Sequence, residues 1–257
     1  MLAGSQVDQF SSPRPVLFKT LASNRSSELI CSLMAKSKSK RLPTIEKIDA
    51  GCYIDFEGFA PNEHNTSPPP VLVGIFRDGL FKQVVFTKAY RWAAKDSGVK
   101  HLVEYCEDRG SFLKELADST SGSKPLFAFS EHERTVIKKE IGHYIKKRFS
   151  YVRAIAKHFF NKYPNVFEEL QGMNEHSLKN VAAKVGLSLT QKLEKGGMTR
   201  RLREVREYSQ SAKKWAAAPD SARRSWREVL EHNRVDTTCL IEILRKLAKK
   251  KEQIRCK

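Results

Sequence analysis

The sequence lacks long hydrophobic runs and closely spaced cysteine pairs, and each absence narrows the class of protein. No apolar stretch approaches the roughly 20 residues that a membrane-spanning helix needs, so no membrane protein is predicted. No C-x-x-C pair occurs, which argues against a structural zinc site. The five cysteines are odd in number and scattered, as expected in a reducing compartment, and we expect a cytoplasmic, nucleoid or nuclear protein. They are Cys31, Cys52, Cys106, Cys239 and Cys256.

Acidic residues are also scarce relative to basic ones. The chain has 29 Asp and Glu against 47 Lys and Arg, with a formal net charge of +18 and an isoelectric point near 9.8. Such an excess favours a polyanionic partner, most often nucleic acid, through phosphate contacts and counterion release. An anionic membrane is a weaker alternative, because no basic amphipathic helix with a Trp and Leu face stands out. A generically basic surface is the third reading.

Two regions of different composition divide the chain. Residues 1–41 are rich in Ser, Lys and Arg and have no clean periodicity, so we expect a disordered or loosely packed extension. Residues 42–257 are long enough for one well-packed domain. The extension lacks the hydrophobic segment of a secretory signal, while an organellar transit peptide stays open. Alternatively, Met34, which precedes a Lys- and Ser-rich stretch, is the true start.

The first half of the domain has the pattern of an antiparallel three-strand meander. Apolar, β-prone residues recur over 47–59, 71–76 and 81–87, and each range predicts a strand. Asp78-Gly79 lies between the second and third ranges, and Asp-Gly between apolar runs is the strongest short hairpin signal. Three consecutive strands with one tight turn predict antiparallel pairing.

The second half alternates helical patterns with one buried strand. Residues 125–130 are apolar without alternation, as in a strand that is buried on both faces. Residues 150–160 allow a short strand end followed by a helix, and Ser177 and Gly186 are the expected cap and stop of another helix. The pattern predicts an α/β fold with a mixed sheet flanked by helices. Helices are expected over 103–116, 131–147, 177–187 and 221–250.

Two carboxylates in the first expected strand form the first candidate site. Asp55 and Glu57 are two positions apart, so both side chains point to one side of the strand while Ile54 and Phe56 point to the other. Like charges this close repel unless a cation lies between them. Hard carboxylate oxygens suit Mg²⁺ or Mn²⁺. A solvent-facing strand with two acids by chance is the alternative.

Further acids occur at two other places. His232 and Asp236 are four residues apart in the last expected helix and so share one face, at the edge of an apolar stripe where a charge needs a partner. Glu131 and Glu133 follow the buried strand, at the kind of strand-to-helix junction where α/β sheets bind ligands. The plainer alternatives are an ordinary charged surface helix for Asp236 and helix capping for Glu133.

Together these elements resemble the ribonuclease-H-like exonucleases of the DEDD type over roughly residues 49–250. The chain is most similar to the predicted nuclease branch found in association with RecB-type nucleases. In that branch a Tyr/Phe-x-x-x-Glu element corresponds to Phe129 through Glu133, where classical members have Asp, and Glu131 competes for the same position. The stretch SLKNVAAKVGL, residues 177–187, is similar to the branch's helix before the last motif.

The resemblance implies a ribonuclease-H-like fold and a 3′-to-5′ exonuclease that hydrolyses phosphodiester bonds with two Mg²⁺ or Mn²⁺ ions. It implies that Asp55 bridges both ions, that Glu57 and Asp236 complete the site of the attacking water, and that Glu133 holds the second ion. His232 would orient or deprotonate that water, although its spacing from Asp236 is that of the Tyr subtype. The alternatives are an inactive nuclease-like binding module and a transposase- or resolvase-like endonuclease of the same fold.

A basic stretch before and within the last expected helix is the candidate for guiding a single-stranded nucleic-acid end. Trp215, Trp226 and Tyr208 are interleaved with it and could stack on bases. Packing is the commoner role of such Trp residues, and a solvated face is the commoner fate of a basic run. No feature reports on the sugar, so DNA and RNA are equal candidates. The residues expected to contact phosphate are Arg200, Arg201, Arg203, Lys213, Lys214, Arg223, Arg224 and Arg227.

Overall fold

The chain divides into two units, Met1–Ser37 and Lys38–Lys257. The computed structural model describes residues 41–60, 63, 65, 68–97, 103–120, 123–142, 149–166, 177–189 and 197–256, all in the second unit. The expected N-terminal extension and the alternative start at Met34 lie outside the described residues. Within the described part, no helix is long and apolar enough to cross a membrane.

A six-stranded mixed sheet forms the centre of the second unit, in the order β4-β3-β2-β1-β5-β6. The pairs β1·β2 and β2·β3 are antiparallel, which confirms the expected meander. The pairs β1·β5, β5·β6 and β3·β4 are parallel. The strands are β1 (Cys52–Gly58), β2 (Pro70–Arg77), β3 (Leu80–Val85), β4 (Val103–Tyr105), β5 (Leu126–Ala128) and β6 (Phe149–Tyr151).

The hairpin between β2 and β3 turns at Asp78 and Gly79. Both residues have positive φ, 51° and 79°, as a tight two-residue turn of the favoured hand requires. Asp78 is the one non-glycine residue with positive φ in the described part of the chain, and Asp tolerates that conformation better than most residues. The Asp-Gly signal in the sequence is therefore confirmed.

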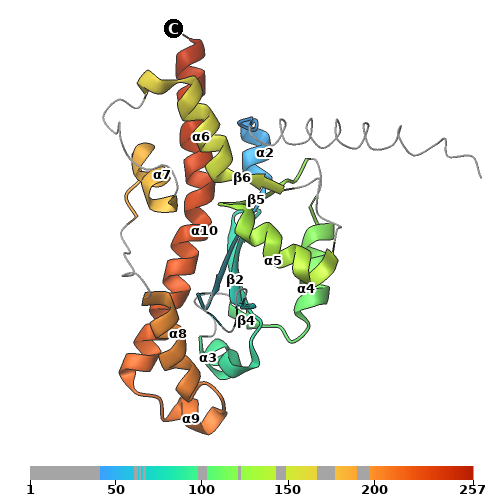
Figure 1. Cartoon of the computed structure of the whole chain (residues 1–257), viewed down its shortest axis with the longest axis vertical. Coiled ribbons are helices and arrows are strands. Elements are labelled where there is room, and N and C mark those ends of the chain that lie inside the picture. Colours follow the sequence, from blue (N-terminus) through green and yellow to red (C-terminus); the bar gives the residue numbers. More distant parts are fainter. Residues whose placement is uncertain are drawn as a thin grey trace, which may run out of the picture. The chain divides into compact units, whose positions relative to one another are not determined.

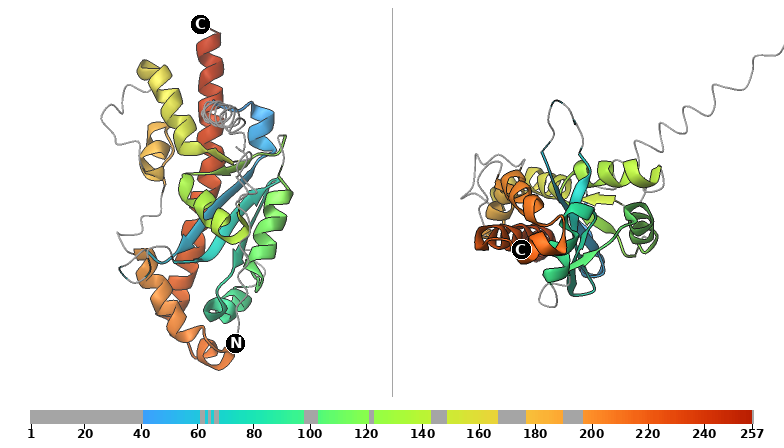
Figure 2. Two further views of the ribbon diagram at one scale, coloured as in Figure 1. Left: turned by 45° about the vertical axis from the view of Figure 1, so that its right-hand side comes forward. Right: turned by 90° about the horizontal axis from the view of Figure 1, so that it is seen from below.

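Helices cover both faces of the sheet (Figures 1 and 2). The described helices are α2 (Ile45–Asp49), η1 (Lys88–Tyr90), α3 (Arg91–Asp96), α4 (Arg109–Asp118), α5 (Glu131–Ile141), α6 (Val152–Lys162), α7 (Leu178–Lys184), α8 (Gly197–Tyr208), α9 (Ala212–Ala216) and α10 (Asp220–Arg255). The longest, α10, runs the length of one face of the sheet, whereas α4 and α5 cover the opposite face (Figure 1).

The side chains of β1 alternate between these two layers. Tyr53 belongs to the core that α10, α6 and α7 form, and it stacks on Phe127 of β5 with ring centroids 4.8 Å apart. Ile54 and Phe56 belong to the core under α4 and α5. Asp55 and Glu57, which alternate with Ile54 and Phe56, therefore lie on the α10 side. The strand periodicity predicted that these two side chains share one side of the strand.

Two predicted boundaries were wrong. The strand expected from residue 47 begins at Cys52, because Ile45–Asp49 forms the short helix α2 with Ile48 fully buried. The helix expected over 103–116 is two elements: the strand β4 and, after it, α4. Asp108 separates them, since its carboxylate accepts a hydrogen bond from the Ser111 amide and starts α4 at Arg109.

Other local predictions are confirmed. Ser177 caps α7 through a hydrogen bond from the Asn180 amide at 3.2 Å, and Gly186 follows the helix with a φ of 76°. Residues 149–162 form β6 followed directly by α6, which is the strand-then-helix alternative for this region. The last helix is longer than expected and spans Asp220–Arg255.

Candidate metal centre

The centre of the α10 face brings together side chains from the two ends of the described sequence. Asp55 and Glu57 project from β1, and His232 and Asp236 lie one turn apart on α10. The Nε2 atom of His232 is 3.5 Å from Oδ2 of Asp236 and 3.8 Å from Oε1 of Glu57. The candidate ligand atoms of Glu57, His232 and Asp236 all lie within 4.8 Å of one another. The structure thus brings three of the five predicted catalytic residues within ligand distance of one another, and Asp55 lies beside Glu57 on the same strand and interacts with it.

Among the described residues, no Lys or Arg forms an ion pair with the carboxylates of this cluster, Asp55, Glu57 and Asp236. The basic side chain beside Glu57 and Asp236 is His232, which is charged only when protonated. All three are only partly exposed, so water screens them weakly. Carboxylates arranged in this way are a candidate site for a cation.

Burial and mutual repulsion raise the pKa values of these carboxyl groups. Burial is the main cause for Asp55, whose pKa lies well above its ordinary value, and the charges of Glu57, Asp236 and Glu133 add to it. Burial followed by the charge of Asp236 raises the pKa of Glu57 to about 8. Burial also raises the pKa of Asp236, against which the nearby His232 acts. Without a cation, the cluster therefore retains protons to higher pH than isolated carboxyls do.

The charge of Glu133 acts on the carboxyl groups of Asp55 and Glu57, but its side chain also caps the helix α5. It is the third residue of α5, and its Oε2 accepts hydrogen bonds from the backbone NH and the Oγ of Ser130, both at 3.2 Å, as part of a capping box. Its side chain is buried, whereas Glu131 is exposed. Of the two competing acids, Glu133 is thus the one that acts on Asp55 and Glu57, while one of its oxygens is committed to the cap.

His232 has one nitrogen in the cluster and one in the interior. Nε2 faces the two carboxylates, and Nδ1 is buried without a hydrogen-bond partner among the described residues. An imidazole in this position can accept a proton, or hold one, or bind a metal through Nε2. The structure therefore leaves both the base and the ligand role available to this side chain.

Asn233 is a residue of the site that the sequence pattern did not single out. It is fully buried, and its Nδ2 donates to the backbone oxygen and to Oδ2 of Asp55, each at 3.0 Å. Although apolar, Val235 is partly exposed, and the buried face of α10 runs through Asn233 and Thr237. The sequence signal that could have revealed Asn233 is the pair of polar residues Asn233 and Thr237, which are four residues apart and so share one helix face with buried apolar neighbours.

The predicted phosphate-contacting residues fall into two groups. Arg201 is committed to Glu228 and to the backbone oxygen of Gly197, and Arg223 bonds to Asp96 at 2.9 Å and to backbone carbonyls. Both guanidinium groups are therefore engaged in contacts within the protein. The other six predicted residues are exposed: Arg200, Arg203, Lys213, Lys214, Arg224 and Arg227.

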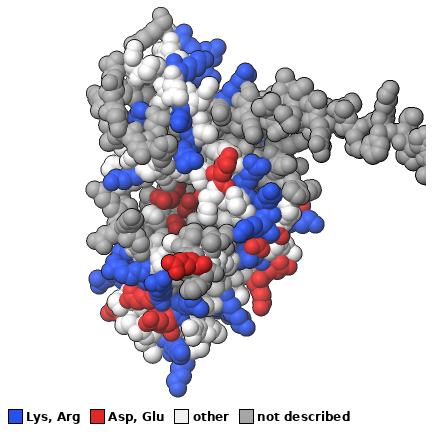
Figure 3. All heavy atoms as spheres, viewed as in Figure 1, with Lys and Arg blue, Asp and Glu red and all other residues white. Residues whose placement is uncertain are grey.

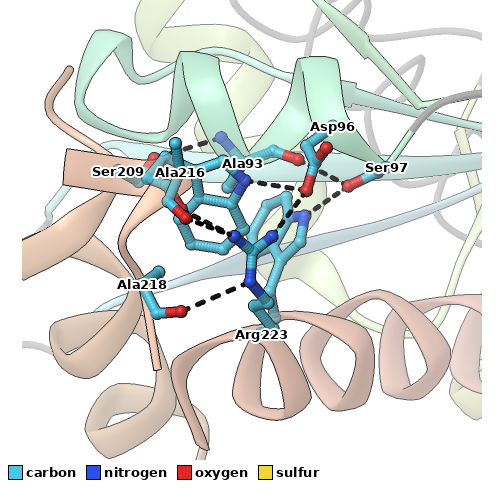
Figure 4. A network of polar contacts seen from close by, with 9 residues as sticks. Ala93, Asp96, Ser97, Ser209, Ala216, Ala218 and Arg223 are labelled. Atoms are coloured by element: carbon cyan, nitrogen blue, oxygen red, sulfur yellow. Dashed lines mark hydrogen bonds and ion pairs between the residues drawn. The ribbon is translucent and has the colours of Figure 1, made fainter. Parts of the chain in front are cut away.

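The aromatic residues in the basic stretch pack rather than face solvent. Trp215 and Trp226 are buried at 5% and 2% exposure, and their indole NH groups donate to Asp96 and Ser97 respectively. Figure 4 shows Arg223 between the carboxylate of Asp96 and the carbonyl oxygens of Ala216 and Ala218. This network joins α3 and α9 to the start of α10, so neither Trp is available to stack on a base in this structure.

The donor set fits a divalent cation of the first transition row or Mg²⁺. Carboxylate oxygens from Asp55, Glu57 and Asp236 are the hard ligands that Mg²⁺ and Mn²⁺ prefer, and an imidazole nitrogen is tolerated better by Mn²⁺. On the side of the molecule seen in Figure 3, acidic side chains are recessed at mid-height, with Lys and Arg above and below them. No protein-family model, curated protein or solved structure matches the chain.

Proposed function

We propose that this chain is a metal-dependent nuclease of the ribonuclease-H-like type that hydrolyses phosphodiester bonds, most simply from the 3′ end of a single strand. The observation that carries the proposal is the meeting of Asp55 and Glu57 with His232 and Asp236, with His232 within 4 Å of two carboxylates and no Lys or Arg ion pair to these acids among the described residues. Repelling carboxylates at one point favour a bound cation.

The sheet supports the same proposal. The resemblance implies an antiparallel meander whose first strand also has parallel neighbours, and β1 has β2 on one side and the parallel pair β5 and β6 on the other. The D-x-E pair lies on the central strand, and α5 begins directly after its parallel neighbour β5. A central strand flanked in this way places its acidic side chains where the last helix can reach them.

The residues that would hold the cation are Asp55, Glu57 and Asp236, with Glu133 contributing its second oxygen directly or through water. When bound, one or two divalent ions supply charge neutralisation at the phosphate and an activated water. The protein's own part is to fix the carboxylates in a partly buried place, where an electrostatic interaction is stronger than in bulk water.

His232 would handle the proton of the attacking water. Its Nε2 is 3.5 Å from Oδ2 of Asp236, so this carboxylate would stabilise the imidazolium once Nε2 has taken the proton of the water. A ligand role for Nε2 is the alternative, and in that case the preference for Mn²⁺ over Mg²⁺ would fall when His232 is replaced by Gln.

The exposed basic residues would contact the phosphates of the substrate. Arg200 and Arg203 lie on α8, whose first turn touches the segment after β1 through a hydrogen bond from the Ala60 amide to Oγ1 of Thr199 at 3.3 Å. That bond ties the basic helix to the end of the strand that bears Asp55 and Glu57. A strand of nucleic acid lying along α8 would therefore pass close to the carboxylates.

The test is digestion of end-labelled single-stranded DNA and RNA with Mg²⁺ or Mn²⁺. A ladder shortened from the 3′ end, lost in Asp55→Ala and retained in Glu242→Gln, supports the proposal. Glu242 is a suitable control because it lies on the same helix but pairs with Arg245 at 3.0 Å, away from the cluster. Internal cuts would indicate an endonuclease instead.

A second candidate function is an inactive nuclease-like module that binds nucleic acid. The observation that favours it is the commitment of one Glu133 oxygen to the capping box, which weakens the second motif as a metal ligand. Tight binding of a single strand without cleavage, with any divalent metal, would support this candidate and refute the enzyme.

A further inference from the structure

A buried pair of amides lies behind the carboxylate cluster, and we propose that it positions Asp55. In this proposal Gln83 of β3 orients Asn233 of α10, and Asn233 in turn holds the Asp55 carboxylate ready for a cation. Both amide side chains are buried, at 1% and 0% exposure. The inference rests on the proposed function, since it assigns positioning residues to that site.

The register of the sheet aligns Asp55 with Gln83 across the intervening strand β2. Asp55 of β1 pairs with Gly74 of β2, and Gly74 pairs with Gln83 of β3. Asp55 and Gln83 are therefore two strands apart, with a glycine between them. Asn233 lies over that gap and bonds to both: its Oδ1 accepts from Gln83 Nε2 at 3.0 Å, and its Nδ2 donates to Asp55 Oδ2 at 3.0 Å.

Gly74 makes this bridge possible. A Cβ atom at position 74 would lie 2.3 Å from Oδ1 of Asn233 and 2.4 Å from Oγ1 of Thr237. Such distances are far inside van der Waals contact, so a side chain at position 74 would displace the side chains of Asn233 and Thr237. The present place of the Asn233 amide, and with it the bridge from Gln83 to Asp55, therefore depends on this glycine.

The direction of the hydrogen bonds follows from a backbone carbonyl. Gln83 Nε2 donates to the carbonyl oxygen of Leu230 at 2.8 Å, and a carbonyl oxygen can only accept. The amino end of Gln83 must therefore face α10, where it also donates to Oδ1 of Asn233. The amino end of Asn233 then has one place to go, toward Asp55. A flipped Asn233 would place two amino groups together and a carbonyl against a carboxylate.

The consequence for the site is a fixed carboxylate. Asn233 donates both to the side chain and to the backbone oxygen of Asp55, which sets the orientation of that side chain on its strand. It also anchors to β1 the turn of α10 that bears His232 and Asp236. Residues two strands away thus set the separation between the two halves of the centre, in the way that outer hydrogen bonds orient metal ligands.

The variants that test this role are Gln83→Met, Asn233→Leu and, as a matched control, Thr237→Val. Met keeps the length of Gln83 but removes the donor, so Asn233 is free to turn. Thr237 is fully buried on the same helix face, and its Oγ1 donates to the backbone oxygen of Asn233 at 2.7 Å, whereas the hydrogen bonds to Asp55 come from Asn233. Thr237→Val therefore removes a buried hydrogen bond of the same helix. It leaves intact the hydrogen bonds from Gln83 through Asn233 to Asp55, which we call the relay.

The measurement is Mn²⁺ binding to the full chain, by electron paramagnetic resonance and calorimetry in the absence of nucleic acid, followed by the Mn²⁺ dependence of cleavage. We expect Gln83→Met and Asn233→Leu to weaken Mn²⁺ binding by about 10- to 100-fold, and Thr237→Val to leave it within twofold of the wild type. At saturating Mn²⁺ the turnover of Gln83→Met should recover to within a few-fold of the wild type, which a general loss of structure would not allow.

Two outcomes overturn the inference. Equal Mn²⁺ affinity in Gln83→Met and the wild type would remove the relay even if the enzyme is active. Equal losses in Gln83→Met and Thr237→Val would reduce it to a packing effect. If Asn233→Leu fails to fold, Gln83→Met against Thr237→Val still decides. A wild type that binds Mn²⁺ in this relay-dependent manner but cleaves nothing refutes the nuclease alone.

Discussion

Two levels of α10 satisfy their charges in opposite ways. At its first turns, Arg223 is surrounded by acceptors: the Asp96 carboxylate and the backbone carbonyls of Trp215, Ala216 and Ala218. In its middle, Asp236 meets Glu57 through His232, with no Lys or Arg ion pair to either acid among the described residues. The charge at the first level is compensated within the protein, whereas at the second level we propose that a cation compensates it. The lack of a Lys or Arg partner within the described part of the chain, rather than the presence of charge, is what distinguishes the second level.

The strongest way to break this contrast is Asp236→Asn. The change removes one of the proposed metal ligands and should lower metal-dependent cleavage by about 10³-fold or more, because a bound metal would supply several kcal/mol of transition-state stabilisation. The metal-free protein should be no less stable than the wild type, since a repelling charge is lost. Single-turnover cleavage and thermal unfolding with chelator measure the two effects.

A loss of stability in the metal-free Asp236→Asn protein comparable to that of a core substitution would contradict the contrast, because it would show an internally satisfied carboxylate. Glu242→Gln serves as the control on the same helix, where an exposed ion pair contributes at most about 1 kcal/mol.

The pH dependence of stability sharpens the same contrast. The pKa of Glu57 is raised to about 8 in the folded protein, and those of Asp55 and Asp236 are also raised. In this pH range the folded state binds protons that the unfolded chain has already released. The contribution of these carboxyl groups to the free energy of unfolding is therefore fully present below about pH 4.5 and is lost as pH rises toward 8. We expect a loss of about 2–4 kcal/mol over that range with chelator present.

Urea unfolding at pH 5, 6.5 and 8 measures this slope. Saturating Mg²⁺ or Mn²⁺ should flatten it, because the cation replaces the protons, and Glu57→Gln should reduce it without metal. A chelated protein whose midpoint is constant between pH 5 and 8 would show that the carboxylates are neutralised from within.

At the other level of α10, Arg223→Met should destabilise the protein by about 2–3 kcal/mol, since several buried or partly buried acceptors lose a charged donor. The apolar stem of Met retains the packing against Trp215, whose ring lies 5.3 Å from the guanidinium. Cleavage per folded molecule should be unchanged. Arg224→Met is the neighbouring control, as Arg224 is exposed. A variant that folds as stably as the wild type but binds nucleic acid poorly would return Arg223 to the substrate-contacting group.

The features of the structure that follow from a local periodic pattern were predicted correctly from the sequence. Alternation in β1 predicted that Asp55 and Glu57 share one side of the strand, helical spacing predicted that His232 lies next to Asp236, and Asp78-Gly79 predicted the hairpin. Each of these depends on a few consecutive residues. Their geometry is local, so the pattern is enough.

The parts that failed depend on contacts between distant residues. Ile45–Asp49 is helical because Ile48 packs in the core, which its β-prone neighbourhood conceals. The position of the Asn233 side chain depends on Gly74 and Gln83. These residues lie on other strands, so no pattern in the sequence around Asn233 predicts the contact. The fates of Arg201 and Arg223 were equally hidden, since an exposed and an internally bonded arginine look alike in a basic run.

The smallest expected effect separates the free arginines from the bonded ones. Arg200 and Arg203 are exposed on α8, and neither forms a hydrogen bond or ion pair within the described part of the chain. Replacing both by Ala should weaken single-strand binding by about 5- to 20-fold at low salt. The dependence of log K on log salt should fall by about 0.7 for each phosphate that the variant no longer neutralises. Fluorescence anisotropy of a labelled oligonucleotide at several salt concentrations, with chelator to prevent cleavage, measures both quantities.

The control for this pair lies on the opposite face of the sheet. Lys114→Ala with Lys139→Ala removes the same charge from α4 and α5 and should change neither quantity by more than long-range screening allows. Equal losses in the two double variants would mean that nucleic acid responds to net charge alone, and α8 would then have no special place beside the carboxylates.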